Sequence, residues 1–179
     1  IGPNGAGKST TFSMIAGALP ATTGSLHFNG ESLLGLPTHA MAARGIVRTF
    51  QHNKPFASMS VRENVMVGMH TRFQGSLWKV LSGTRGAAQA EADSARRADE
   101  LVDFVGLGEW RDADVGTLSF GQGRLLEIAR GLAAEPRLML LDEPAAGLPP
   151  HECERLSAII RQIAQRTPGG TGRTAPARE

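Results

Sequence analysis

The chain carries, close to its first residue, a glycine-rich segment, GPNGAGKS, that runs from Gly2 to Ser9. Its spacing, G-x-x-x-x-G-K-[S/T], is typical of loops that wrap the phosphates of a nucleotide. Glycines let successive backbone N–H groups turn toward phosphate oxygens, and a following helix adds its positive N-terminal end. Lys8 supplies a mobile cation, and the Ser9 hydroxyl is a hard oxygen ligand for Mg²⁺. The segment predicts a nucleotide site, with an ordinary glycine turn before a helix as the alternative.

A second motif, LMLLDEP, lies far along the chain and ends an apolar run in two acids. A short continuous apolar run is typical of a strand buried on both faces. Asp142 at its end can hold Mg²⁺ through water, and Glu143 can orient an attacking water or accept its proton. The alternative is a buried strand with an acidic turn. Together with the glycine loop, the motif favours a site that hydrolyses a nucleoside triphosphate.

A third motif, LSFGQ at 118–122, precedes a predicted helix. Ser119 and the backbone amide of Gly121, placed at a helix N-terminus, can bind another phosphate. Serine and glycine before a helix are also a common cap, so the motif alone leaves both interpretations open. Its place between the other two motifs favours the phosphate-binding one.

Composition limits the class of protein. A length of 179 residues suits one domain, and 41% hydrophobic and 20% charged residues are ordinary for a globular chain. Lysine and arginine are scattered and the formal charge is +2, so we expect no nucleic-acid partner. Cys153 is the single cysteine, which excludes an intramolecular disulfide and fits a reducing compartment. With neither a membrane-length apolar run nor a signal sequence, we expect a cytosolic chain that reaches a membrane only through a partner.

Periodicity predicts a chain of alternating helices and strands. The predicted helices lie at 8–19, 36–45, 60–73, 89–105, 121–134 and 150–166. The predicted strands are a hairpin at 24–34 around Asn29-Gly30, followed by strands at 45–51 and 138–142. Residues 167–179 are rich in glycine, proline and arginine and predict a disordered tail.

Along the chain the motifs follow the order glycine loop, RTFQ at 48–51, LSFGQ and LMLLDEP. This order resembles that of ATP-binding-cassette (ABC) ATPases over residues 1–166. LSFGQ is similar to the family's signature motif and RTFQ to its Q-loop. The segments GLPTHAMAARGIVRTFQ, SVRENVMVG and LLDEPAAGL are similar to stretches in the ATP-binding subunits of branched-chain amino-acid importers. The resemblance implies an α/β P-loop NTPase core with a parallel sheet flanked by helices, small antiparallel strands and a helical subdomain at about 52–118.

The resemblance also implies roles for individual residues. Catalytic roles fall to Glu143, Gln51 and Lys8, although Gln51 without the family context is an ordinary polar residue at a strand end. Metal ligands would be Ser9, Gln51 and Asp142. ATP would be bound by Asn4, Gly5, Ala6, Gly7, Lys8, Ser9 and Thr10 of one chain and by Ser119, Gly121 and Gln122 of a second chain in a head-to-tail dimer.

The implied function is ATP binding and hydrolysis, with Mg²⁺, in an importer of branched-chain amino acids or similar solutes. The implied partners are a second ATP-binding subunit, transmembrane permease subunits and, indirectly, a solute-binding protein, at the cytoplasmic face of the membrane. Two alternatives remain open: a truncated, inactive fragment of such a subunit, and an ABC ATPase that acts in DNA repair or on ribosomes instead of in transport.

The sequence departs from the family pattern in three places. The family has strands and an adenine-stacking aromatic residue ahead of the phosphate loop, and Ile1 leaves no room for them. It also has a histidine about thirty residues beyond the position of Glu143, where this sequence has none, and an aspartate or asparagine where Pro149 stands. We therefore expect a chain that lacks the N-terminal strands and the C-terminal part.

Overall fold

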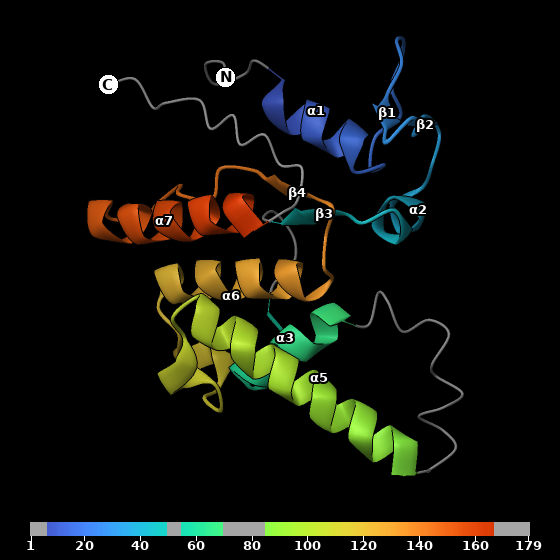
Figure 1. The fold of residues 1–179 in the computed structure, drawn as a ribbon. Helices are drawn as coiled ribbons and strands as arrows, with labels where there is room; N and C mark the ends of the chain where they lie inside the picture. Colours follow the sequence, from blue (N-terminus) through green and yellow to red (C-terminus); the bar gives the residue numbers. More distant parts are fainter. Residues whose placement is uncertain (1–6, 50–54, 70–84, 167–179) are drawn as a thin grey trace.

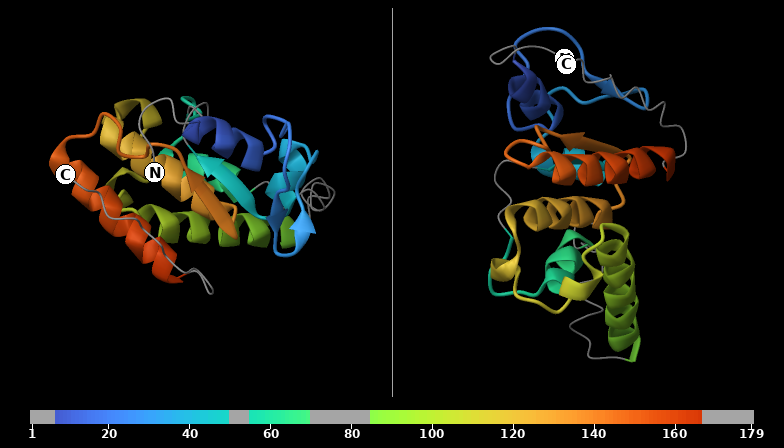
Figure 2. Two further views of the ribbon diagram at one scale, coloured as in Figure 1. Left: turned by 90° about the horizontal axis from the view of Figure 1, so that it is seen from above. Right: turned by 90° about the vertical axis from the view of Figure 1, so that its left-hand side faces the viewer.

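The computed structural model describes residues 7–49, 55–69 and 85–166, and its elements are stacked in layers (Figure 1). Helix α1 (Lys8–Ile15) lies on one side of a parallel strand pair, and α6 (Phe120–Ala133) lies on the other. Helices α3 (Val61–Met69) and α5 (Arg85–Phe104) lie beyond α6, as the two further views also show (Figure 2). The predicted alternation of helices and strands around a parallel sheet is confirmed.

The parallel pair consists of β3 (Ile46–Thr49) and β4 (Leu138–Leu141). Ile46 pairs with Leu138, and the register continues to Thr49 opposite Leu141. Alternate residues of a strand point to opposite faces. Thr49 and Met139 therefore face α6, where a methyl group added to Gly131 would lie 2.9 Å from each of their side chains. The other face of the pair is left for α1.

A small hairpin joins α1 to the sheet. Strands β1 (His27–Phe28) and β2 (Glu31–Ser32) are antiparallel, with His27 opposite Ser32. Asn29 and Gly30, the two turn residues, have φ of 51° and 83°, the left-handed pair that a tight hairpin needs. The predicted Asn-Gly turn is confirmed, and α2 (Thr38–Ala43) then leads into β3.

Helix α1 is shorter than the predicted helix over 8–19. Ala16 is its C-cap, and Gly17 follows at φ 71°, donating its N–H to the Met14 carbonyl at 3.1 Å. A left-handed glycine closes the carbonyl end of a helix because it carries no Cβ to clash. A Cβ at this glycine would also meet the Leu36 carbonyl oxygen at 2.7 Å, so the close packing of the next segment requires glycine.

The main core lies among the helices. Two 3-10 turns, η2 (Gly108–Trp110) and η3 (Val115–Thr117), precede α6, and β4 separates α6 from the last helix, α7 (Pro150–Arg166). The buried core residues here are Val61, Val65, Met69, Ala98, Val102, Val105, Leu107, Val115, Leu125, Leu126, Ile128, Ala129, Ala133, Leu156 and Ile159. A second buried cluster beside α1 consists of Ala16, Leu33, Met41, Ile46 and Leu140. Within the described ranges, no helix is both long and apolar enough to cross a bilayer.

Candidate functional site

The N-terminus of α1 opens directly from Gly7, which has φ 77° and serves as the N-cap without any side-chain capping bond. Thr11 donates both its backbone N–H, at 2.9 Å, and its hydroxyl, at 3.0 Å, to the Gly7 carbonyl. The first N–H groups of a helix have no partner within the helix, and its positive end attracts anions. The N-terminus of α1, with Lys8 and Ser9 on its first turn, is thus suited to bind an anion such as a phosphate.

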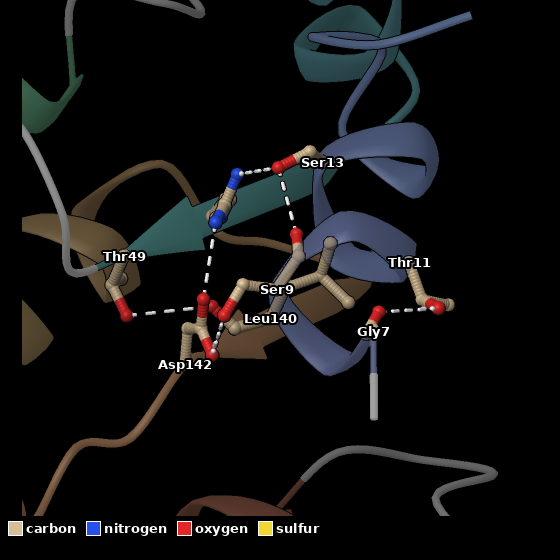
Figure 3. Close-up of polar contacts among 8 residues, drawn as sticks. Gly7, Ser9, Thr11, Ser13, Thr49, Leu140 and Asp142 are labelled. Carbon is tan, nitrogen blue, oxygen red and sulfur yellow. Dashed lines mark hydrogen bonds and ion pairs between the residues drawn. The ribbon is translucent and has the colours of Figure 1, made fainter. Parts of the chain in front are cut away.

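Asp142 lies at the carboxyl end of β4 and is 6% exposed. The Ser9 hydroxyl donates to its Oδ1 at 3.3 Å, so residues 133 positions apart in the sequence meet at one point (Figure 3). The fold therefore brings two of the predicted metal ligands together. In this arrangement a strand end and a helix start point at the same small volume, as expected of ligand sites at the carboxyl edge of a parallel sheet.

A further pair of residues, not identified from the sequence, completes this cluster. Arg48 donates Nη2 to Asp142 Oδ2 at 3.1 Å and Nη1 to the Ser13 hydroxyl oxygen at 2.8 Å. Ser13 in turn donates to the Ser9 carbonyl at 2.7 Å (Figure 3). The only signal in the sequence is strand alternation, which puts Arg48 on the same face as Ile46.

Glu143 follows Asp142 with φ 48°, a left-handed conformation that side-chain-bearing residues seldom adopt. Its carbonyl accepts the Ala146 N–H at 3.1 Å, which closes a turn directly after the strand. The Glu143 side chain is exposed, beside the nearly buried carboxyl of Asp142. Strained backbone of this kind is concentrated at functional sites. Here it accompanies a change from the buried carboxylate of Asp142 to the exposed carboxylate of Glu143.

The third motif forms a capping box at the start of α6. The Ser119 hydroxyl accepts the Gln122 N–H at 3.2 Å, and Gln122 Oε1 accepts the Ser119 N–H at 2.8 Å. The box uses the acceptor atoms of both side chains, whereas the Ser119 O–H and the Gln122 NH₂ group are donors. Ser119 is exposed and Gln122 is half-buried, so the Ser119 hydroxyl and the helix N-terminus face solvent in an arrangement that suits an anion.

Gly121, in the same motif, packs against the first turn of α7. A Cβ at Gly121 would collide with the carboxylate of Glu152, and a cavity of about 20 Å³ lies beside this contact. Glycine lets the two helix N-termini pack closely here, and a larger residue would push the Glu152 side chain aside. Sequence reasoning gave Gly121 a phosphate-binding role and missed Glu152, which is 31 positions away.

The side chains that follow the capping box carry charge along α6. The Phe120 ring is 59% exposed, and the Arg124 guanidinium carbon lies 4.9 Å from its centre. Arg124 also donates to Glu127 at 3.2 Å. Burial raises the pKa of Glu127, against the hydrogen bond and charge of Arg124, which lower it. Burial lowers the pKa of Arg130 one turn further on, although Glu127 opposes that change.

The oxygen atoms at the start of α1 and at the end of β4 fit a magnesium ion. Mg²⁺ is held in nucleotide sites by one or two carboxylates or hydroxyls together with phosphates and waters. The Ser9 hydroxyl and the Asp142 carboxylate supply hard oxygens of this kind. Over the described ranges no group of three or more histidine, cysteine or acidic residues gathers into a metal cage. The donors fit a cation that shares its ligands with phosphates.

The remaining predicted site residues are distributed as follows. Gly7, Lys8, Ser9 and Thr10 lie together at the start of α1. Ser119, Gly121 and Gln122 lie together at the start of α6, on a different element. Asn4, Gly5, Ala6 and Gln51 lie outside the described residues, as does the predicted tail at 167–179. The roles proposed for all these residues stay predictions.

Sequence comparison relates the chain to known proteins. A family described as "ABC transporter" matches residues 1–146. The chain is 40% identical, over 163 residues, to the high-affinity branched-chain amino acid transport ATP-binding protein BraF of Pseudomonas aeruginosa, and 38% identical to LivG of Escherichia coli K12, described in the same words. It is 37% identical to the lipopolysaccharide export system ATP-binding protein LptB of E. coli K12. Each match covers 91% of the chain but only 62–64% of the relative.

Structural comparison gives the same relationship. The ADP conformation of MJ1267, an ATP-binding cassette of an ABC transporter, matches with a TM-score of 0.75 and 28% identity, over 93% of this chain and 65% of that one. A nucleotide-free ATP-binding cassette from an ABC transporter matches with a TM-score of 0.72 and 30% identity, over 94% of this chain and 64% of that one.

Proposed function

Because the chain belongs to the ABC transporter family, as the match over residues 1–146 confirms, we propose that it binds and hydrolyses ATP to drive a membrane transporter. The observation that carries the proposal is the convergence of Ser9 and Asp142, 3.3 Å apart, at the N-terminus of α1. The fold class predicted from the sequence, a P-loop NTPase of the ABC type, is confirmed by the matched cassettes. The roles of individual residues and the transported solute are part of the proposal.

ATP would be held by the glycine loop and α1. The backbone of Asn4, Gly5, Ala6, Gly7 and Thr10 would wrap the phosphates, and the Lys8 ammonium would neutralise the outer ones. Ser9 and Asp142 would hold Mg²⁺, with Gln51 near it. The ion, when bound, supplies charge neutralisation on the phosphate oxygens.

Hydrolysis would transfer the γ-phosphoryl group to water. The water oxygen forms a bond to the γ-phosphorus, the bond from that phosphorus to the bridging oxygen breaks, and ADP and inorganic phosphate leave. The Glu143 carboxylate would orient the water and accept its proton, and Gln51 would assist in orienting it. The exposure of Glu143 beside the nearly buried Asp142 supports this division of roles.

A second chain would complete each site. Ser119, Gly121 and Gln122 lie at the start of α6, on a different element from the loop that binds the phosphates, and carry hydroxyl, backbone and amide donor groups; Ser119 is exposed, Gln122 half-buried and Gly121 buried. In a head-to-tail dimer these donors would contact the γ-phosphate held by the partner chain. A related fold solved as a dimer after hydrolysis, with ADP and phosphate, supports such an assembly, although at 23% identity the likeness concerns the fold.

The transported solute is proposed to be a branched-chain amino acid or a similar small solute. BraF and LivG, at 40% and 38% identity, carry that function in their names. LptB, at 37%, favours a second candidate, an exporter of lipopolysaccharide. In either case the chain would sit at the cytoplasmic face of the membrane, bound to permease subunits through the helical subdomain at about 52–118, and for import a solute-binding protein would act on the other side.

Ligand-dependent unfolding tests the nucleotide site. We expect Mg-ATP at a hundredfold excess over its dissociation constant to stabilise the chain by about 2.7 kcal/mol. Lys8→Ala should abolish the shift in thermal midpoint, whereas Arg161→Ala, at an exposed position on α7, should retain it. A broad transition without a shift in the unaltered chain would support the alternative of an inactive fragment and contradict the proposal.

Co-purification in detergent tests the partner. The chain should be retained by the membrane subunits of a branched-chain amino-acid importer and not by those of a lipopolysaccharide exporter. The reverse result would assign the chain to the second candidate function. Retention by neither, in a chain that still binds Mg-ATP, would favour an ABC ATPase that works outside transport.

A further inference from the structure

Arg48, on β3, forms an ion pair with Asp142, directly after β4. The two side chains are 18% and 4% exposed, and their nearest atoms lie 3.1 Å apart. A carboxylate as buried as that of Asp142 is stable in its charged form only with a close counter-charge or a metal ion. In this structure the guanidinium of Arg48 supplies that charge.

We propose that Arg48 is a counter-charge that Asp142 must share with Mg²⁺, and that it keeps the affinity of the bare site for divalent cations low. The inference rests on the proposed nucleotide site and goes beyond it by assigning a role to a residue outside the motifs. Arg48 acts through Asp142, so it is a positioning residue.

The hydrogen bonds of Asp142 support this role. Oδ1 accepts from the Ser9 hydroxyl at 3.3 Å, and Oδ2 accepts from Arg48 at 3.1 Å. Both carboxylate oxygens therefore already have a donor. A cation that approaches Ser9 and Asp142 must displace or share these bonds, and it must do so beside a fixed positive charge.

The second hydrogen bond of Arg48 explains why the charge is fixed. Its Nη1 donates to Ser13 at 2.8 Å, and Ser13 donates to the Ser9 carbonyl at 2.7 Å. The guanidinium is thus bound to α1 and to the end of β4 at once, and cannot swing away without losing both partners. Through its bonds to Ser13 and Asp142, Arg48 also holds Asp142 next to the turn of α1 that carries Ser9 (Figure 3).

Electrostatics gives the direction and scale of the effect. A unit charge within several ångströms of a divalent cation, at an effective dielectric constant of about 20, changes the cation's binding constant by more than about tenfold. The phosphates of a bound nucleotide add negative charge that offsets Arg48. The cation is therefore expected to bind well only together with nucleotide, and this coupling should weaken when Arg48 is neutral.

Binding of Mn²⁺, a hard divalent ion detectable by electron paramagnetic resonance, tests the proposal on the full chain. Without nucleotide, Arg48→Gln should bind Mn²⁺ at least about tenfold more tightly than the unaltered chain, while Arg48→Lys, which keeps the charge, should stay within about threefold. An equal or weaker affinity of Arg48→Gln would overturn the proposal, because a merely structural role of Arg48 predicts a loss of affinity.

Two further measurements keep the test decisive. If the unaltered chain binds no Mn²⁺ even with ADP, the proposed nucleotide site is wrong; if it does and Arg48→Gln shows no gain without nucleotide, only the present inference fails. Should Arg48→Gln unfold, millimolar Mg²⁺ should restore its thermal transition, and the neutral pair Arg48→Gln/Asp142→Asn should fold without metal. Failure of either restoration would show that Arg48 acts by packing, and would overturn the proposal.

Discussion

Two parts of the molecule are held together by different forces. The helical layer, defined as α3, α5, α6 and α7, buries an apolar core to which all four helices contribute residues. The strand layer, defined as α1, β1 to β4 and α2, has a smaller apolar cluster, from Ala16 to Leu140. It also contains a polar cluster at Asp142, which is hydrogen-bonded to Ser9 and Arg48.

The difference indicates where a ligand can act. Apolar packing is non-directional and does not depend on a bound ion. The packing of the helical layer is therefore expected to be the same with and without nucleotide or metal. A buried ion pair stabilises a structure only while its charges are balanced. The arrangement of the strand layer therefore depends on the charge near Asp142, and nucleotide and metal binding are expected to change that layer first.

The largest effect should come from truncating the apolar core. Leu126, on α6, is fully buried. Leu126→Ala should lower the free energy of unfolding by about 3 kcal/mol, since the change removes buried methyl groups and leaves a cavity. Urea unfolding followed by circular dichroism measures it, with Leu19→Ala, at a side chain 46% exposed, as the control expected to change stability by less than about 0.5 kcal/mol. A loss below about 1 kcal/mol for Leu126→Ala would contradict the apolar account of the helical layer.

The second prediction concerns the close approach of α3 and α6. A Cβ at Gly68 would collide with the Arg130 carbonyl oxygen and lie 3.0 Å from the Ala133 methyl. Because a backbone atom cannot rotate aside, Gly68→Ala should cost about 2 kcal/mol of unfolding free energy.

Gly123 provides the matched control within the same layer. Apart from the neighbouring residues and the backbone of α6 itself, no atom lies within 4 Å of a Cβ built at this position. Gly123→Ala should therefore gain up to about 1 kcal/mol from helix propensity alone. Chemical denaturation of the two variants measures the difference, and equal effects would mean that helix propensity, not close packing, determines the outcome at Gly68.

The features that could be predicted from the sequence depend on local residues. The turn at Asn29 and Gly30 needs two left-handed residues, and few other pairs supply them. The start of α6 can be predicted from Ser119 and Gln122, because serine is a favoured N-cap and a glutamine three residues later completes a capping box. The strand at 138–142 follows from an uninterrupted apolar run, and the structure assigns β4 to Leu138–Leu141.

The features that could not be predicted depend on contacts between distant residues. The pairing of β3 with β4 brings Arg48 and Asp142 together across 94 positions, and no local pattern encodes that register. Gly121 and Glu152 meet because two helices begin side by side. The positive φ of Glu143 arises from the turn after β4, and glutamate has no preference for that conformation.

A smaller effect is expected from that strained residue, which lies in the turn after β4. Glu143 has φ 48° directly after Asp142, whereas the other two described non-glycine residues with positive φ, Asn29 and Glu135, lie in a hairpin turn and at the end of α6. Glu143→Gly should raise the free energy of unfolding by about 1 kcal/mol, because glycine adopts this conformation without strain.

The control is Glu143→Ala, which removes the carboxylate and keeps a Cβ. Thermal unfolding without nucleotide should show a gain for glycine and none for alanine. A gain of the same size in both variants would place the cost in the charge of Glu143 next to Asp142, not in its backbone, and would extend the electrostatic account of the strand layer to this residue.

The smallest effect compares two capping boxes of the helical layer. At α3, Ser60 donates its N–H to Glu63 Oε2 at 2.7 Å, and Glu63 donates its N–H to the Ser60 hydroxyl at 3.3 Å. At α6 the corresponding box is formed by Ser119 and Gln122, whose amide does not titrate. The geometry is shared, and only the first box contains an ionisable group.

The pH dependence of stability should therefore differ between these two helix ends. The hydrogen bond from the Ser60 backbone, aided by its hydroxyl, lowers the pKa of Glu63 below the ordinary value of 4.5. Below pH 4.5 the unfolded chain binds more protons at this position than the folded chain, so stability rises with pH in that range. The stability that Glu63 contributes is fully present above pH 4.5 and is lost as the pH falls through the pKa of the folded state. Between about pH 6 and pH 3, the thermal midpoint of Glu63→Gln should depend less on pH than that of the unaltered chain. The midpoint of Gln122→Glu should depend on pH more strongly. Parallel curves for all three chains would mean that the boxes fix helix starts without coupling them to protons.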